Sequence, residues 1–143
     1  MPDYFKTDAF QDQFWSVIDD LDFILRQALD EYPDLKAVIH GYDYAIPSGN
    51  GPWLLAPLER LGVPRNLRQS VIDRIVDWFN RAQIEMVAQI NRDYGETRVV
   101  HADLRNCTLN GQWYDEIHPT SVGFAQIAAR IRRALLAAHP LVA

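Results

Sequence analysis

Residues 36–44 read KAVIHGYDY, and this short stretch decides the fold. It begins with a β-prone run and then reaches Gly41, which predicts a buried strand that ends in a loop carrying polar groups. A second stretch, TRVVHA at residues 97–102, has the same character and precedes an irregular loop over residues 103–114. The chain is therefore expected to contain two short strands, each delivering polar side chains to the loop after it.

Helical patterns surround both strands. Apolar residues recur at helical spacing over residues 10–29 and from a capping Asn66 to about residue 92, and shorter patterns cover residues 53–61 and 119–135. The order helix, strand, two helices, strand, helix implies parallel strands joined by crossovers. We therefore expect a three-layer α/β fold with about two strands and four helices. Because parallel sheets usually have more strands, the sheet is expected to be incomplete.

Composition narrows the class of protein. The 143 residues, 48% hydrophobic and 23% charged, fit one domain over residues 1–143. A net charge of −5 argues against a nucleic-acid partner. No apolar run approaches the roughly 18 to 20 residues of a membrane span, and the N-terminus lacks the features of a signal peptide, so a soluble cytoplasmic protein is expected. Cys107 is the only cysteine, which excludes an internal disulfide and a cysteine-based zinc site.

The stretch most informative about chemistry is YDEIHPTSVG at residues 114–123. Asp115 stands three residues before His118, in the loop before the last helix. A carboxylate that binds one imidazole nitrogen fixes the tautomer and leaves the other nitrogen free as a general base, which amounts to two members of a catalytic triad. By spacing alone, a surface ion pair or a local cap explains the pair at least as well.

The same stretch resembles the final conserved block of the SGNH/GDSL hydrolase superfamily, an Asp-x-x-His-Pro motif that opens the last helix. Further similarity to one bacterial branch of that superfamily runs in order along the chain, so that essentially the whole sequence resembles the C-terminal half of such a domain. The stretches that carry it are HGYDYAIP at 40–47, GPWL at 51–54, Phe79 and Asn80, VVHADLR at 99–105, and Gly123, Phe124, Ile127 and Ala128 after the motif.

The resemblance implies a flavodoxin-like sheet and an ester or acyl hydrolase that needs no cofactor or metal. In such an enzyme His118 would take the proton from a serine, and Asp115 would orient His118. The family's Gly-Asp-Ser nucleophile block and its oxyanion blocks are N-terminal to the region matched here, and this sequence has no counterpart of them. We therefore expect the isolated chain to be inactive, and a complementing N-terminal segment or another copy to be its partner.

Several alternatives stay open from the sequence. Ser48 and Ser121 are the loop serines that could replace the missing nucleophile, although a glycine-rich turn and a helix start explain them as well. Aromatic and acidic residues could wall a cleft for a small ester, or simply cover the sheet: Tyr42, Asp43, Tyr44, Trp53 and Trp113. Two other functions compete with the hydrolase. One is a non-catalytic, self-associating interaction module. The other is a divalent-metal site formed by three pairs: His40 with Asp43, His101 with Asp103, and Asp115 with His118.

Overall fold

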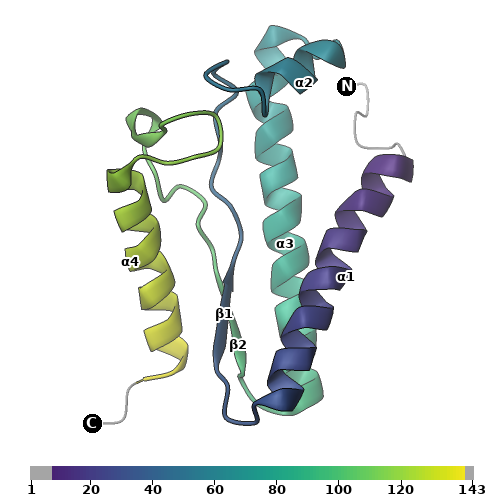
Figure 1. The fold of residues 1–143 in the computed structure, drawn as a ribbon, viewed down its shortest axis with the longest axis vertical. Coiled ribbons are helices and arrows are strands. Elements are labelled where there is room, and N and C mark those ends of the chain that lie inside the picture. Colours follow the sequence, from purple (N-terminus) through teal and green to yellow (C-terminus); the bar gives the residue numbers. More distant parts are fainter. Residues whose placement is uncertain (1–7, 141–143) are drawn as a thin grey trace.

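The computed structural model describes residues 8–140 and has a mixed α/β architecture that is mostly helical (Figure 1). The elements follow the expected order along the chain. They are α1 (Asp8–Glu31), β1 (Ala37–His40), α2 (Leu55–Arg60), a short 3-10 turn (Arg65–Leu67), α3 (Arg68–Tyr94), β2 (Val99–Ala102), a second 3-10 turn (Asn110–Gln112) and α4 (Ser121–Ala138). No helix within residues 8–140 is long and apolar enough to cross a membrane.

The described residues form one sheet of two parallel strands, with Ala37 opposite Val99 and His40 opposite Ala102. Figure 1 shows α4 on one side of this sheet and α1 with α3 on the other, so the strands lie between two helical layers. The expected parallel pairing and layered α/β arrangement are confirmed. Both strands run toward the end of the molecule where the loops after Gly41 and after Ala102 lie, and the polar residues of those loops therefore gather there.

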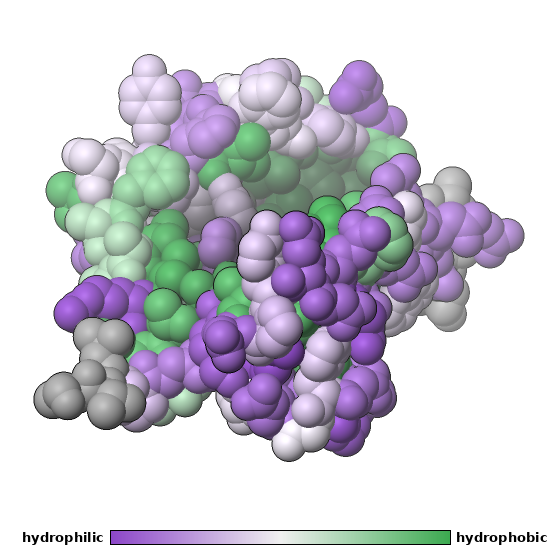
Figure 2. Space-filling view, turned by 60° about the horizontal axis from the view of Figure 1, so that its bottom comes forward, coloured by the Kyte–Doolittle hydropathy of each residue, from purple (hydrophilic) through white to green (hydrophobic). Residues whose placement is uncertain are grey.

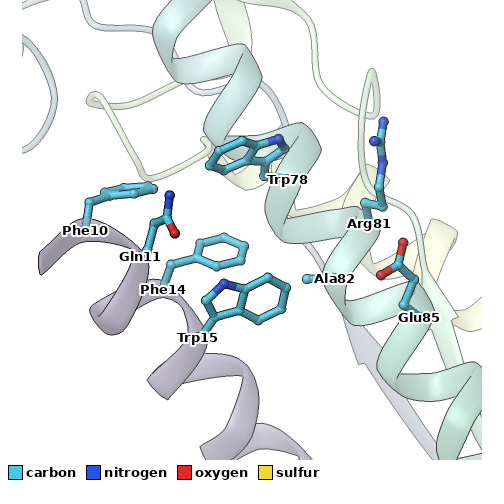
Figure 3. A pocket seen from close by; sticks show the side chains of 8 residues that line it. All are labelled: Phe10, Gln11, Phe14, Trp15, Trp78, Arg81, Ala82 and Glu85. Carbon is cyan, nitrogen blue, oxygen red and sulfur yellow. The ribbon is translucent and has the colours of Figure 1, made fainter. Parts of the chain in front are cut away.

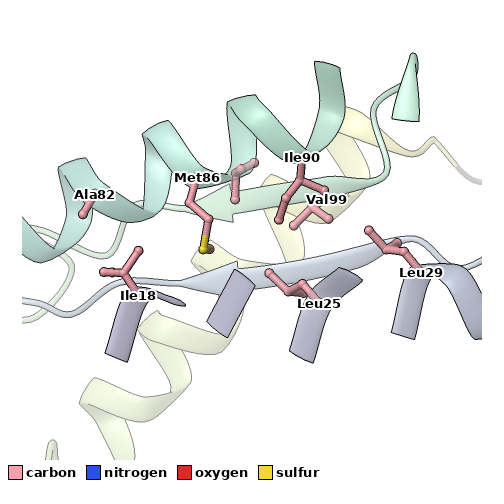
Figure 4. Packing of buried hydrophobic residues seen from close by; sticks show 8 residues of the cluster. Ile18, Leu25, Leu29, Ala82, Met86, Ile90 and Val99 are labelled. Carbon is pink, nitrogen blue, oxygen red and sulfur yellow. The ribbon is translucent and has the colours of Figure 1, made fainter. Parts of the chain in front are cut away.

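Two apolar clusters hold the layers together. The first joins Leu25 and Leu29 of α1 to Met86 and Ile90 of α3, over Val99 of β2 (Figure 4). The second lies under the loop after β1, where Ala45, Leu58 and Val63 pack against the first turns of α3. Burial of the α3 stripe explains why this helix continues for 27 residues, until Gly95 ends it in the left-handed conformation at φ 70°.

The helix starts differ in how they are capped. Thr120 caps α4, because its side chain accepts a hydrogen bond from the Gly123 N–H. The expected cap at Asn66 is wrong: a 3-10 turn occupies Arg65–Leu67, and α3 begins after Leu67 with no side-chain cap. Since the 3-10 turn already bonds some of the first N–H groups, the helix start does not depend on the asparagine side chain.

The two outer edges of the sheet differ in whether a side chain bonds their backbone groups. On the β2 edge, the Asn91 amide of α3 accepts from the N–H groups of Arg98 and Val99 and donates to the Val99 carbonyl, all at 2.8–2.9 Å. The side chain thereby replaces part of a neighbouring strand. The β1 edge has no such cap among the residues that the structure describes, and no residue of β1 is fully buried. Asn91 therefore caps the start of the β2 edge, whereas the β1 edge is open among the described residues.

Candidate active site

Asp115 and His118 lie in a tight turn at the carboxyl end of the sheet. The turn is closed by the Tyr114 N–H, which donates to the His118 carbonyl at 2.8 Å, and by a bridge between Trp113 and Pro119. Asp115 Oδ1 accepts from the backbone N–H groups of Ile117 and His118 at 2.9 and 2.7 Å. The other carboxylate oxygen, Oδ2, lies 2.8 Å from His118 Nδ1. One side chain therefore both shapes the turn and binds the imidazole.

This geometry fixes the chemistry of the imidazole. A carboxylate can only accept, so His118 Nδ1 carries the proton and Nε2 is left as a proton acceptor. The bond from His118, together with the two backbone bonds, lowers the pKa of Asp115, which keeps it ionised at neutral pH. The His118 side chain is 56% exposed. An oriented base with an accessible Nε2 is what general-base catalysis requires.

His118 borders a cavity of about 440 Å³ between the loop after β1, the 113–119 loop and α4. Its walls are mostly apolar, with a few polar groups at the end near the strands. The lining residues are His40, Tyr42, Asp43, Leu104, Trp113, Ile117, His118, Pro119, Phe124 and Ile127. A mostly apolar cavity with a few convergent polar groups is the usual character of a small-molecule site.

The loop after β1 is attached directly to the turn that carries His118. The Tyr42 hydroxyl donates to the Ile117 carbonyl, and the Asn50 side-chain amide donates to the Tyr114 carbonyl at 2.6 Å. Burial, with the nearby carboxylates of Asp115 and Asp43, raises the pKa of Tyr42, so its hydroxyl stays protonated and able to donate. The Asp115–His118 pair therefore lies at the carboxyl end of the strands, beside the loop that follows Tyr44.

Glu116 is a residue of this region that the sequence reasoning missed. It is 0% exposed, and its carboxylate accepts four backbone N–H bonds from Gly49, Trp53, Leu54 and Leu55 at 2.9–3.0 Å. Burial opposes ionisation, but the four bonds together lower its pKa. One sequence signal points to such an acceptor: Leu54, the residue before α2, has a side chain that cannot cap a helix, so the first N–H groups of α2 need a partner from elsewhere.

Of the five residues considered as walls of a substrate cleft, Trp113 lines the His118 cavity, and the other four fall into two groups. Tyr42 and Asp43 line the His118 cavity, but both Asp43 oxygens are occupied: Oδ2 accepts from the Thr108 backbone and hydroxyl at 2.6 and 2.7 Å, and Oδ1 from the Tyr44 N–H. Tyr44 and Trp53 lie outside the lining. The Tyr44 hydroxyl donates to Asp77 at 2.8 Å, and Trp53, 51% exposed, borders a different apolar hollow beside α2.

Neither loop serine belongs to the cavity. Ser48 lies in the exposed turn after Pro47, where its hydroxyl accepts from the Asn50 N–H at 3.3 Å, and Ser121 is the first residue of α4. Within residues 8–140, no serine or cysteine lines the cavity beside His118. Cys107 is half-buried elsewhere, and burial raises the pKa of its thiol. Among the described residues, the structure therefore places no serine or cysteine in the wall of this cavity.

The three histidine–acid pairs do not converge into a metal site. His40 Nδ1 lies 2.8 Å from the Gly41 carbonyl, and His101 Nε2 lies 3.1 Å from Gln83 Oε1. Asp103 is held by Arg105 at 2.6 Å. In the part of the chain that the structure describes, no group of three or more histidine, cysteine or acidic side chains could hold a metal ion. Among the described residues, the side chains of the three pairs instead have bonding partners nearby.

A second hollow, of about 260 Å³, lies between α1 and α3 and is separate from the His118 cavity (Figure 3). Its aromatic wall is formed by Phe10, Phe14 and Trp15 of α1 and by Trp78 of α3, with edge-on contacts between the rings of Phe14 and Trp15 and of Phe14 and Trp78. The hollow shares no lining residue with the cavity beside His118.

The chain matches no family model, no curated protein and no solved structure.

Proposed function

We propose that this chain supplies the general base, His118, and its orienting carboxylate, Asp115, to an SGNH-type ester or acyl hydrolase whose serine comes from another polypeptide segment. The observation that supports this most directly is the 2.8 Å contact between Asp115 Oδ2 and His118 Nδ1, in which His118 also lines a mostly apolar cavity. An oriented base beside a cavity matches the role that the Asp-x-x-His-Pro resemblance implies.

In the proposed reaction, His118 Nε2 takes the proton of the serine hydroxyl as the serine oxygen attacks the ester carbonyl. Asp115 stabilises the imidazolium that forms and stays ionised. The imidazolium then gives its proton to the departing alcohol, which leaves an acyl-serine. A water molecule, activated by the same Nε2, hydrolyses the acyl-serine and restores the enzyme. A small ester is the proposed substrate, because the cavity walls offer mainly apolar contacts.

The open β1 edge suggests where the missing segment would bind. In parallel sheets the ligand crevice lies outside the carboxyl ends of the strands. A strand added parallel to β1 would end beside the loop after Gly41, on the side of the His118 cavity, so a residue directly after that strand would approach Nε2. On the β2 edge, the Asn91 side chain already occupies the N–H and carbonyl of Val99, which a further strand would need at that point.

A second candidate function is non-catalytic and involves the same β1 edge. The chain would act as an interaction module that pairs β1 with β1 of another copy, which buries the open edge and the half-exposed apolar residues of α4. The observation in its favour is the contrast between the capped β2 edge and the uncapped β1 edge within the described residues.

The test is complementation. The isolated chain should show negligible hydrolysis of p-nitrophenyl acetate and no labelling by a fluorophosphonate probe. Addition of a polypeptide that carries a strand, the Gly-Asp-Ser block and the Gly-x-Asn-Asp block should restore both. His118→Ala should abolish the restored activity with the circular dichroism spectrum unchanged. His139→Ala, near the end of α4, is the matched control and should leave the activity intact.

Two results would overturn the proposal. Strong labelling of the chain by itself, mapped to Ser48 or Ser121, would mean that the nucleophile is internal. Restored activity that survives His118→Ala would mean that the base lies elsewhere.

A further inference from the structure

The buried carboxylate of Glu116 joins two segments that are far apart in sequence. Oε1 accepts from the N–H groups of Gly49 and Leu55, and Oε2 from those of Trp53 and Leu54. All four acceptor directions of the ionised carboxylate are used. The 49–55 segment thus forms a pocket of converging N–H groups that the chain fills with its own carboxylate.

The two residues next to Glu116 in the sequence both belong to the candidate site. Asp115 precedes it and binds the imidazole, while Ile117 follows it and lines the His118 cavity. Since the peptide units on both sides of Glu116 are fixed by its anchored side chain, a shift of the anchor moves both neighbours. The His118 side chain itself is 56% exposed, so its position depends on the turn that carries it.

We infer that Glu116 is the positioning residue of this site: its carboxylate, seated in the N–H groups of residues 49–55, holds the turn in which Asp115 orients His118. This role rests on the proposed function, because Glu116 would affect the reaction only by positioning the base, His118. The chemistry of the seat is specific for an anion. A glutamine in the same place would turn an NH₂ group toward two of the four N–H donors, and an alanine would leave all four donors buried without an acceptor.

The experiment reads the His118 tautomer in the isolated chain by long-range ¹H–¹⁵N NMR, which needs no activity. In the wild-type chain the Nδ1-protonated form should predominate, as the contact with Asp115 requires. Glu116→Ala and Glu116→Gln should both lose this preference, with a mixture of tautomers. Excess sodium formate should restore it in Glu116→Ala by filling the empty seat, whereas sodium chloride at the same ionic strength should not.

Glu59→Ala is the matched control, because Glu59 is an exposed acid of α2 whose partner is Arg68. It should leave the His118 tautomer unchanged. The methyl resonances of the Leu29, Met86 and Ile90 core report whether each variant remains folded. If Glu116→Ala fails this criterion, the milder Glu116→Gln decides. In the complemented assembly, kcat should fall with KM little changed, and formate should restore kcat in the alanine variant.

The inference is overturned if folded Glu116→Gln keeps the wild-type tautomer, or if formate has no effect on folded Glu116→Ala. Absence of activity in the complemented wild-type assembly would instead count against the proposed function alone, because the tautomer measurement stands without it.

Discussion

Gly41, the first residue after β1, is required by lack of space rather than by its backbone angle. A Cβ placed there would lie 2.0 Å from Oδ1 of Asn80, a fully buried residue of α3 whose amide donates to the Tyr42 and Val76 carbonyls. We predict that Gly41→Ala costs about 1–3 kcal/mol in the free energy of unfolding, because the buried amide must move away from its partners. Urea denaturation measures the loss.

The control for this substitution is Gly111→Ala, because nothing lies within 4 Å of a Cβ at Gly111. Gly111→Ala should leave the free energy of unfolding within about 0.5 kcal/mol of wild type. The double variant Gly41→Ala, Asn80→Ala should lose less than the sum of the single losses, since the second change removes the obstacle. Full additivity would contradict the proposed clash.

Glu116 gives the stability of the chain a defined pH dependence. Its pKa is lowered in the folded state, so folding favours the ionised form. The resulting stabilisation is complete above the ordinary glutamate pKa of 4.5, declines as the pH falls below it, and is absent below the lowered folded pKa. We therefore predict that wild type and Glu116→Gln differ most in free energy of unfolding at neutral pH and converge under acid conditions.

Urea denaturation of both proteins across this range measures the difference. Glu59→Gln is the control. Its free energy of unfolding should differ from that of wild type by much less across this pH range, because Glu59 is exposed and makes only a surface salt bridge. A wild-type advantage over Glu116→Gln that is constant from neutral to acid pH would show that the seat does not distinguish charge.

At the residue scale, the sequence could reveal pairs that are close in the chain and little else. Asp115 and His118 stand three residues apart, so one turn brings them together and their spacing carried the signal. Glu116 binds residues 49–55, more than 60 positions away, and no spacing rule reports such a contact. The bonds from Thr108 to Asp43 escaped sequence reasoning for the same reason, because Thr108 comes from the loop after β2.

Among the elements, α3 both covers the sheet and caps the start of the β2 edge, where the Asn91 side chain bonds the backbone of Arg98 and Val99. We predict that Asn91→Ala costs about 2 kcal/mol, since the N–H groups of buried Arg98 and Val99 lose their acceptor. Amide exchange at Val99 should speed up more than at residues of the α1–α3 core. Gln89→Ala, an exposed amide on the same helix, should change neither quantity; an equal loss in that control would assign the effect to helix stability instead.

Element positions followed from periodicity, and element ends did not. The apolar stripes of α1 and α3 and the β-prone runs at Ala37 and Val99 set the order and type of each element, since burial of one face requires those periods. The start of α3 was misjudged because Asn66 has the composition of a cap, while a 3-10 turn performs the bonding. Local composition does not distinguish these two ways of satisfying the same N–H groups.

At the scale of the whole molecule, the side of the sheet at β1 has an open strand edge with apolar side chains exposed beside it. In Figure 1, β1 lies in front of β2. Figure 2, which turns the molecule so that its bottom comes forward, shows apolar residues gathered in a hollow between hydrophilic flanks. In α4, Gly123 is the buried residue and Phe124 is 52% exposed, although Phe124 lines the His118 cavity. An open strand edge beside uncovered apolar side chains is a surface that another strand can complete.

The last prediction concerns what occupies this edge when no complementing segment is present. Because Ala37 donates its N–H to the carbonyl of Arg98, the residue before β2, the alternation along a strand directs the Val38 N–H away from β2. Val38→Pro therefore removes no bond inside the sheet but blocks a neighbouring strand. We predict that the wild-type chain self-associates at micromolar concentration and that Val38→Pro and Phe124→Asp are monomeric by light scattering with unchanged circular dichroism spectra. Val122→Asp, an equally exposed change outside the cavity lining, should still associate.

A strictly monomeric wild-type chain, or association that survives Val38→Pro, would contradict pairing at β1. The same edge also links the two candidate functions, since one strand position cannot hold a second copy and a serine-bearing segment together. Titration of the segment into the wild-type chain should therefore dissociate the self-associated form in proportion to the segment bound, and Val38→Pro should prevent both complexes. If the segment instead binds the self-associated form without dissociating it, the serine reaches His118 by a route that does not pass along β1.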